Sequence, residues 1–316
     1  MFAPPPLVVA ETFARLPDHL RRAGRQSDWL KVNARGANRH SLLEGPSFDA
    51  EGRLYLADVP FGRIFRVSQK GVFSVISEYD GQPNGLKIHR DGRIFIADYR
   101  RGIMLLDPDS GKVTPILVEA NDGPFKGVND LFFASNGDLY FTDQGQTGLH
   151  DPSGRVFRLD AAGKLHLVVA GIPSPNGITM AADESCIYVA VTRDNAIWRL
   201  PRRLDGLVSK VGAYIRLSGG IGPDGIALDS SGGLAVAHIG LGAAWIFNAI
   251  GEPVLRINMP EGRSPTNVAY GGVDGKTLFI TEADSGCVMM IRVEIPGHSM
   301  FGGWVPTSGV AANRLL

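Results

Sequence analysis

The sequence predicts an all-β fold: a six-bladed β-propeller with four antiparallel strands in each blade, built as a single domain over residues 1–316. Three observations lead to this prediction. A short element recurs six times, apolar segments of strand length follow each copy, and segments with helical periodicity are almost absent. Glycine is also frequent, at 40 residues in 316, against an average of about 7%, which indicates many turns.

The recurring element is a polar residue at the start of a short apolar segment. The polar residue is Asn in four of the six copies, and the next residue is Gly in four of the six. The element reads "PNGLKI", "VNDLFF", "PNGITM" and "PDGIAL" in four of the units. Its six copies start at Glu44, Asn84, Asn129, Asn176, Asp224 and Asn267. Successive copies are therefore 40, 45, 47, 48 and 43 residues apart. This is the length of a propeller blade and is longer than the repeat of a β-helix or a leucine-rich solenoid.

The four strands of a unit can be followed in the first copy. The element starts the first strand, a polar turn with Gly follows, and "LYLAD" forms the second strand of a hairpin. The third strand is "GRIFRV" and the fourth is "FSVISEY". The same order recurs in later units, for example as "IFIAD" then "GIMLLD" and as "LYFTD" then "GRVFRL".

The two ends of the chain are expected to complete the ring. The last unit has three clear strands and then "EIPGHSMFGGW", which predicts a loose tail over residues 296–316. The segment "LVVAETF" near the start resembles a strand but has no partner nearby in the sequence. We expect it to pair with the last unit, because this pairing closes the ring and hides two strand edges.

Residues 20–40 precede the first unit and do not follow the repeat. They contain one acid, Asp28, and six basic residues: Arg21, Arg22, Arg25, Lys31, Arg35 and Arg39. The segment is either a solvated linker or a lid over the channel mouth, whose positive charge would attract anionic substrates. The sequence leaves both possibilities open.

Composition argues against several classes of partner. Lys plus Arg equals Asp plus Glu, at 32 each, so neither nucleic acid nor an anionic membrane is an expected partner. No apolar run approaches the roughly 18 residues of a membrane span. Cys186 and Cys287 lie in apolar strand segments and are expected to be buried, reduced thiols. Since the start of the chain does not resemble a signal peptide, we expect a cytoplasmic protein, either a monomer or a weak homo-oligomer.

The six polar residues of the element are expected to surround one mouth of the central channel, because the first strand of each blade lines that channel. Glu44 and Asp224 provide carboxylates, and Asn129 and Asn176 provide amide oxygens. These are hard donors that suit Ca²⁺, Mg²⁺ or Mn²⁺. Two neighbouring carboxylates repel each other and raise one pKa, and a divalent cation removes this conflict. The alternative is that each residue only caps its own turn, but six copies in register favour a metal site.

A second set of polar residues ends the second strands: Asp58, Asp98, Asp143, Thr192, His238 and Glu282. Most of these are expected to be polar residues at strand-to-turn junctions. Asp58 and Asp143 are candidates to reach the channel. His238 is either a structural histidine or an acid–base group, since imidazole titrates near neutrality.

The chain resembles the gluconolactonase family, also called the senescence-marker-protein and luciferin-regenerating-enzyme family, over about residues 40–293. The resemblance is carried by "LEGPSF" with "LYLADVPFGRIFRV", and by "GVNDL", "SPNGI" and "GPDGIALD". It implies a six-bladed propeller with one catalytic divalent cation: Ca²⁺, Mg²⁺, Mn²⁺, Zn²⁺ or Fe²⁺. It implies that the cation is held by Glu44, Asn129, Asn176 and Asp224. Asn84 and Asn267 remain as neighbouring or substrate-binding residues.

One position departs from the family pattern. Members that act on sugar lactones carry an Arg two residues before the Asn of the third unit, where this chain has Gly127 beside Lys126. The pocket has therefore lost a multidentate donor for substrate hydroxyls. We expect small or less hydroxylated lactones to be hydrolysed at least as well as glucono-1,5-lactone. Lys126 is a partial replacement for the Arg, and residues such as Tyr140 are expected to shape the pocket.

The predicted reaction is lactone hydrolysis by water, with the carbonyl polarised by the cation. Asp224 is the first choice for the base, with Asp143 and His238 as alternatives. No Ser lies in a Gly-x-Ser-x-Gly motif, which argues against an acyl-enzyme. Three alternatives remain: hydrolysis of organophosphates at the same kind of site, metal-free amine condensation on a strictosidine-synthase-like propeller, and a non-catalytic binding module stapled by Ca²⁺.

Overall fold

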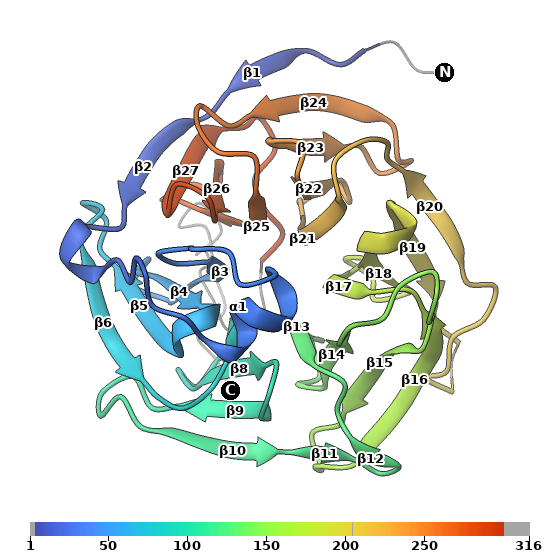
Figure 1. Cartoon of the computed structure of the whole chain (residues 1–316). Coiled ribbons are helices and arrows are strands. Elements are labelled where there is room, and N and C mark those ends of the chain that lie inside the picture. The colour runs from blue at the N-terminus through green and yellow to red at the C-terminus, as the bar shows by residue number, and fades with distance from the viewer. Residues whose placement is uncertain (1–3, 204, 300–316) are drawn as a thin grey trace, which may run out of the picture.

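The computed structural model describes residues 4–203 and 205–299, and it confirms the six-bladed propeller. The six sheets stand around a central channel (Figure 1). Blade one contains β3 (Leu43–Phe48), β4 (Leu54–Asp58), β5 (Arg63–Val67) and β6 (Phe73–Glu78). Blade two contains β7 (Pro83–Ile88), β8 (Ile94–Asp98), β9 (Gly102–Leu106) and β10 (Val113–Leu117). Blade three contains β13 (Val128–Phe133), β14 (Leu139–Asp143), β15 (Gly154–Leu159) and β16 (Leu165–Ile172).

The other three blades repeat this arrangement. Blade four contains β17 (Pro175–Met180), β18 (Cys186–Val191), β19 (Ala196–Pro201) and β20 (Gly212–Arg216). Blade five contains β21 (Gly222–Leu228), β22 (Leu234–Ile239), β23 (Ala243–Phe247) and β24 (Pro253–Asn258). Blade six contains β25 (Pro265–Gly271), β26 (Thr277–Glu282), β27 (Cys287–Arg292) and β2 (Glu11–Arg15). A small hairpin of β11 (Glu119–Ala120) and β12 (Gly123–Pro124) lies between blades two and three in the sequence.

The N-terminal segment closes the ring, as predicted, but it contacts two blades instead of one. β2 pairs antiparallel with β27 and becomes the fourth strand of blade six. β1 (Leu7–Val9) pairs parallel with β24 and adds a fifth strand to blade five. The prediction that the whole segment joins the last unit was therefore wrong for its first three residues. The extra strand covers the outer edge of blade five, which a four-stranded blade would leave exposed.

The hydrophobic core lies between neighbouring blades. One cluster joins Leu43 and Phe65 of blade one to Phe279 and Val288 of blade six. Comparable clusters fill the other interfaces. Each innermost strand also has a register shift near its first residues, for example between Glu44 and Ser47. Such bulges re-aim side chains, and here they lie at the polar residues of the repeated element.

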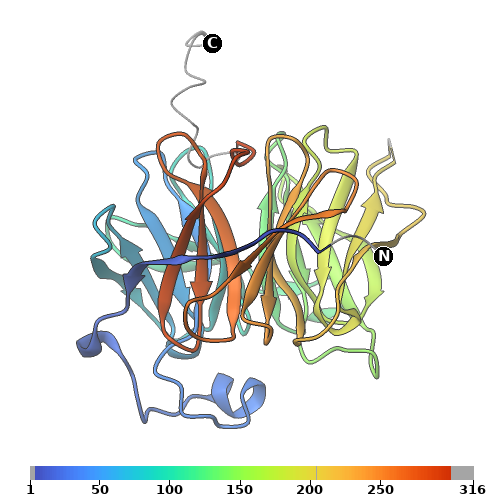
Figure 2. The same ribbon diagram turned by 90° about the horizontal axis from the view of Figure 1, so that it is seen from above.

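The basic segment, residues 20–40, lies across the face at which the innermost strands begin (Figures 1 and 2). It contains one short helix, α1 (Asp28–Asn33), whose first turn is capped by the hydroxyl of Ser27. Leu30 is fully buried, and Trp29 packs on a small apolar cluster that includes Val59. These contacts hold the helix against the propeller.

Residues 296–298, at the start of the predicted loose tail, form backbone hydrogen bonds with the propeller. The backbone N–H of His298 donates to the carbonyl of Leu228, and that of Gly297 donates to Gly275. Residues 300–316 of the predicted tail lie outside the described residues. No helix in the described part of the chain is long and apolar enough to cross a membrane.

Candidate metal and substrate site

The six polar residues of the repeated element come together where the innermost strands begin. We call this set the oxygen ring: Glu44, Asn84, Asn129, Asn176, Asp224 and Asn267. All six are buried, with 3–7% of each residue exposed. The amide nitrogen of Asn267 donates to Glu44 Oε2 at 3.0 Å, which joins blade six to blade one. Blades far apart in the sequence therefore contribute to a single polar centre.

The Gly that follows most ring residues allows the strands to converge. A Cβ on Gly45 would lie 2.4 Å from the carbonyl oxygen of Asn84 on the next blade. A Cβ on Gly177 would lie 2.5 Å from the carbonyl oxygen of Asp224. Both distances are too short for a side chain, so these glycines allow close packing of backbones and do not form hairpin turns.

The buried carboxylates of the ring carry unfavourable charge. Burial raises the pKa of Glu44 to about 7, and the negative charge of Asp130 adds to the effect. Burial also raises the pKa of Asp224 well above its ordinary value, and the charges of Glu44 and Asp130 raise it further. Three carboxylates thus share one buried region, with the Lys87 ammonium 3.8 Å from Asp130 Oδ1.

Asp130 was not among the residues predicted from the sequence. It is almost fully buried, and its Oδ1 accepts a hydrogen bond from the N–H of Leu131. The signal was present in "GVNDL", because Asp130 stands where four of the six units have Gly. Its carboxylate occupies the space above Gly85, where a Cβ would lie 2.4 Å from Asp130 Oδ1.

The ring residues fit a hard divalent cation. Asp224 Oδ1 and Asn84 Oδ1 are buried and have no hydrogen-bond partner among the described residues. The amide nitrogen of Asn129 donates to Gln144 Oε1 at 2.8 Å, which leaves the amide oxygen for the channel. Within residues 4–203 and 205–299, no three His, Cys, Asp or Glu side chains could hold an ion by themselves. A cation here would therefore depend on the amide oxygens, as Ca²⁺ sites often do.

A loop of blade three holds Asn129 in place. Gln144 also donates from Nε2 to the hydroxyl of Ser174 at 2.9 Å. The hydroxyl of Thr147 donates to the Gln144 carbonyl and accepts from the Ser174 N–H. The sequence analysis missed Gln144, and its position directly after the second strand of its unit was the only available signal.

The carboxylates at the ends of the second strands hold the loops between blades and are not free. Asp143 Oδ1 accepts from the N–H of Gly127, and Oδ2 accepts from Arg155 Nε and Nη2. Asp58 has the same arrangement, with the N–H of Leu42 and the side chain of Arg63. The structure therefore does not bring these two carboxylates into the ring.

His238 and Tyr140 also lie outside the ring. The His238 ring is fully buried in blade five, where Nε2 contacts the Gly219 carbonyl at 2.9 Å and Nδ1 accepts from Trp245 Nε1. Burial lowers the pKa of His238, so both nitrogens of a neutral imidazole are in use. Tyr140 is fully buried in the core between blades three and four. Lys126 is exposed, beside Gly145.

The departure at Gly127 has a structural counterpart in Tyr99. The φ of Gly127 is +154°, and a Cβ there would lie 2.5 Å from Tyr99 Cε2. The aromatic ring of Tyr99 thus occupies the place of a side chain at position 127. Gln146 Nε2 donates to the Tyr99 hydroxyl and to Asn33 Oδ1 of helix α1, both at 2.7 Å. Blades two and three and the basic segment meet at this point.

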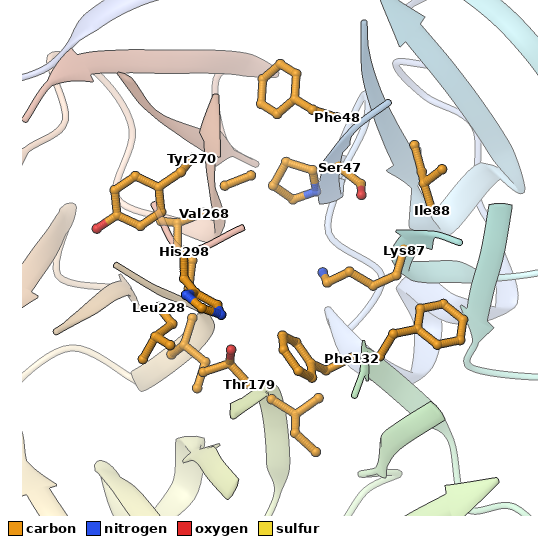
Figure 3. A pocket seen from close by; sticks show the side chains of 16 residues that line it. Ser47, Phe48, Lys87, Ile88, Phe132, Thr179, Leu228, Val268, Tyr270 and His298 are labelled. Carbon is orange, nitrogen blue, oxygen red and sulfur yellow. The ribbon is translucent and has the colours of Figure 1, made fainter. Parts of the chain in front are cut away.

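Two cavities are lined by residues that neighbour the ring residues in the sequence or bond to them, although no ring residue lines either cavity. The first, which we call the mouth cavity, has a volume of about 590 Å³ and is lined by Asn33, Gln144, Gly145, Gln146, Thr147, Gly148, Leu149, His150, Ser174 and Arg193. The second lies further along the channel and is lined by mostly apolar residues, with Lys87 and His298 pointing into it (Figure 3). Its volume is only about 60 Å³, which is room for a few waters. The mouth cavity is the one large enough for a substrate.

The fold and the ring define a class of protein: a propeller with an oxygen-donor centre at one mouth of its channel. The chain belongs to the SMP-30/gluconolactonase/LRE-like family, whose characteristic region matches residues 42–284.

One sequence relative supports this membership, and two solved structures share the fold. The chain is 32% identical over 295 residues to lactonase drp35 of Staphylococcus epidermidis, covering 88% of this chain and 85% of the relative. The structure of a calcium-binding protein, regucalcin, from Agrobacterium tumefaciens superposes with a TM-score of 0.73 at 23% identity, covering 92% and 98% of the two chains. A gluconolactonase from Xanthomonas campestris gives 0.71 at 21% identity, with the same coverage. The two structures support the fold.

Proposed function

We propose that this protein hydrolyses lactones at the oxygen ring and that a divalent cation held there is required. The observation that carries the proposal is the buried pair of Glu44 and Asp224, whose charges are not compensated within the ring. Unpaired buried carboxylates are costly, and a cation among them offsets that cost. The relation to a lactonase at 32% identity supports lactone hydrolysis.

Glu44, Asn129, Asn176 and Asp224 would hold the cation. When bound, the cation would polarise the lactone carbonyl and stabilise negative charge on its oxygen. Asn267 supports this set by orienting Glu44, and Gln144 supports it by orienting Asn129. Such supporting contacts fix how ligands point.

Asp224 is the favoured acceptor for the proton of the attacking water. Its Oδ1 is buried without a hydrogen-bond partner among the described residues, and its pKa is raised by burial. The rival candidates are engaged elsewhere: Asp143 by Gly127 and Arg155, and His238 by Gly219 and Trp245. A base must reach the proton that it removes, so free oxygen atoms in the ring favour Asp224. No feature of the site favours the organophosphate or binding-module alternatives.

The cellular setting is proposed from the cysteines and the net charge. Cys186 and Cys287 are both free and buried, which suits a reducing compartment such as the cytoplasm. The balanced charge of the chain supports a small molecule as the partner, with neither nucleic acid nor a membrane surface involved.

The test is a panel of lactones and simple esters, measured on chelated protein and on protein resupplied with Ca²⁺, Mg²⁺, Mn²⁺, Zn²⁺ or Fe²⁺. We expect turnover to require a cation, and Glu44→Gln and Asp224→Asn to lower both turnover and cation affinity measured by calorimetry. Glu119→Gln, on an exposed strand residue, serves as the matched control. Full activity of the chelated protein, or unchanged cation binding in both variants, would contradict the proposal.

A further inference from the structure

The mouth cavity is lined by basic side chains and by no acidic side chain. Of its ten lining residues, Arg193 carries a guanidinium, His150 carries an imidazole, and none is Asp or Glu. The remaining side chains are amides, hydroxyls and one Leu. The ring next to it is rich in carboxylates, so the two halves of the site have opposite electrostatic character.

Arg193 is unpaired in this cavity. No described Asp or Glu forms an ion pair with it, although its neighbour Asp194 accepts from Trp198 Nε1 and pairs with Arg216. Several arginines nearby have partners: Arg21 with the Ser285 carbonyl, Arg22 with Glu78, Arg39 with Asp284, and Arg155 with Asp143. A guanidinium without a counter-ion beside a cavity is available to bind an anion.

The position of Arg193 relative to the ring is fixed by its turn. It belongs to the short helix η3 (Thr192–Asp194), in which the hydroxyl of Thr192 donates to the carbonyl of Pro223 at 2.8 Å. Pro223 directly precedes Asp224.

His150 stands on the same side of the cavity. A Cβ at Gly148 would lie 3.1 Å from His150 Nδ1 and 3.6 Å from Arg193 Cγ, so Gly148 separates the two basic side chains. The backbones of Gly148 and Asp151 exchange two hydrogen bonds, which makes a tight turn that presents His150. Two basic groups from different blades thus face one space.

We propose that the preferred substrates are lactones that carry a free carboxylate, and that Arg193 is the specificity-determining residue that binds it. This inference rests on the proposed function of the ring. Arg193 attracts such an anionic substituent in a bidentate pair, and its place in the lining of the mouth cavity puts that pair outside the ring. The substrate is therefore oriented with its carboxylate toward blade four and its lactone carbonyl toward the ring.

The experiment compares a five-membered lactone carboxylate with its neutral amide on wild type, Arg193→Met and Arg193→Lys. We expect Arg193→Met to lower kcat/KM for the acid roughly 10- to 100-fold, mainly through KM, because one charge-assisted pair is lost. Turnover of the amide should change less than about twofold. Arg193→Lys should recover part of the loss. Arg203→Met, which removes an exposed arginine paired with Asp205, is the matched control.

A binding measurement separates this inference from the proposed function. The corresponding lactam carboxylate has the same anion but resists hydrolysis, and its affinity is measured by calorimetry. Binding by wild type with a similar loss in Arg193→Met supports the inference, even if no lactone is turned over. Equal handling of acid and amide by wild type, or equal lactam binding by wild type and Arg193→Met, overturns it. Hydrolysis of the neutral lactone alone would then leave the proposed function intact.

Discussion

The charge of Glu44 makes the stability of the metal-free protein depend on pH in an unusual direction. The pKa of Glu44 rises from an ordinary value of 4.5 to about 7 in the folded chain, mainly because of burial. Between these two pH values the folded protein keeps a proton that the unfolded chain has released. The raised pKa of Glu44 therefore contributes its full amount to the free energy of unfolding below about pH 4.5. This contribution is lost as the pH rises through about 7.

The magnitude follows from the span between the two pKa values. The pKa rises from 4.5 to about 7, by about 2.5 units. Each unit corresponds to about 1.36 kcal/mol, so the free energy of unfolding changes by about 3 kcal/mol across this range. Glu44→Gln cannot ionise and escapes this loss. Between pH 4.5 and pH 8, the free energy of unfolding of metal-free Glu44→Gln should rise by about that amount relative to metal-free wild type.

The measurement is urea unfolding of chelated protein across this pH range. Other groups also titrate there, so the quantity compared is the difference between wild type and Glu44→Gln. Glu119→Gln, which changes an exposed carboxylate, should follow wild type throughout. Added Ca²⁺ should remove the wild-type loss, since a bound cation favours the ionised carboxylate. A difference between wild type and Glu44→Gln that stays constant with pH would refute the reasoning.

Three further predictions concern the scaffold. Gly127→Ala should lower the free energy of unfolding by about 1–3 kcal/mol, because its Cβ meets the Tyr99 ring. Adding Tyr99→Ala should restore part of this in urea unfolding, and no restoration would show that the clash is not the cause. Arg63→Met leaves the buried Asp58 carboxylate unpaired, so unfolding should become about 3–5 kcal/mol easier; an effect below about 1 kcal/mol would contradict this. Removing residues 1–10 deletes β1 but leaves blade five with four strands, so the protein should stay monodisperse by size-exclusion chromatography. Removing residues 1–16 also deletes β2, leaves blade six with three strands and exposes the edge of β27, so the protein should aggregate. Equal behaviour of the two truncations would contradict this.

The sequence predicted the blades well because the repeat is reinforced six times. A single Asn-Gly pair fits several kinds of turn or strand. Six copies of the polar element at blade spacing fit only the inner strands of propeller blades. The positions of Glu44 and Asp224 in the ring followed from that register alone. Closure of the ring by the N-terminal segment was predicted. The sequence did not show that β1 pairs with blade five and β2 with blade six, because a strand-like segment can hydrogen-bond to the edge of either blade.

The features around the ring could not be read from the sequence, because they depend on contacts between units. Tyr99 fills the space at Gly127 although 28 residues separate them in the chain. His238 looked available at a strand end, but Trp245 on the adjacent strand and the Gly219 carbonyl use both of its nitrogens. A strand-end position indicates where a side chain starts but not which neighbour it meets.

Some residues at the site differ from the residues at the same place in other units. The residues that the units share explain why these differences can be accommodated. Asp130 replaces the usual Gly, and its carboxylate fits because the neighbouring unit keeps Gly85. Arg193 lies on a turn that Thr192 anchors, so an unpaired guanidinium can be exposed without loosening the blade. In a ring of similar units, the shared residues hold the strands close together. The charges that differ between units then place carboxylates at the centre of the channel mouth and Arg193 at one side, and the proposed preference for an anionic lactone depends on that placement.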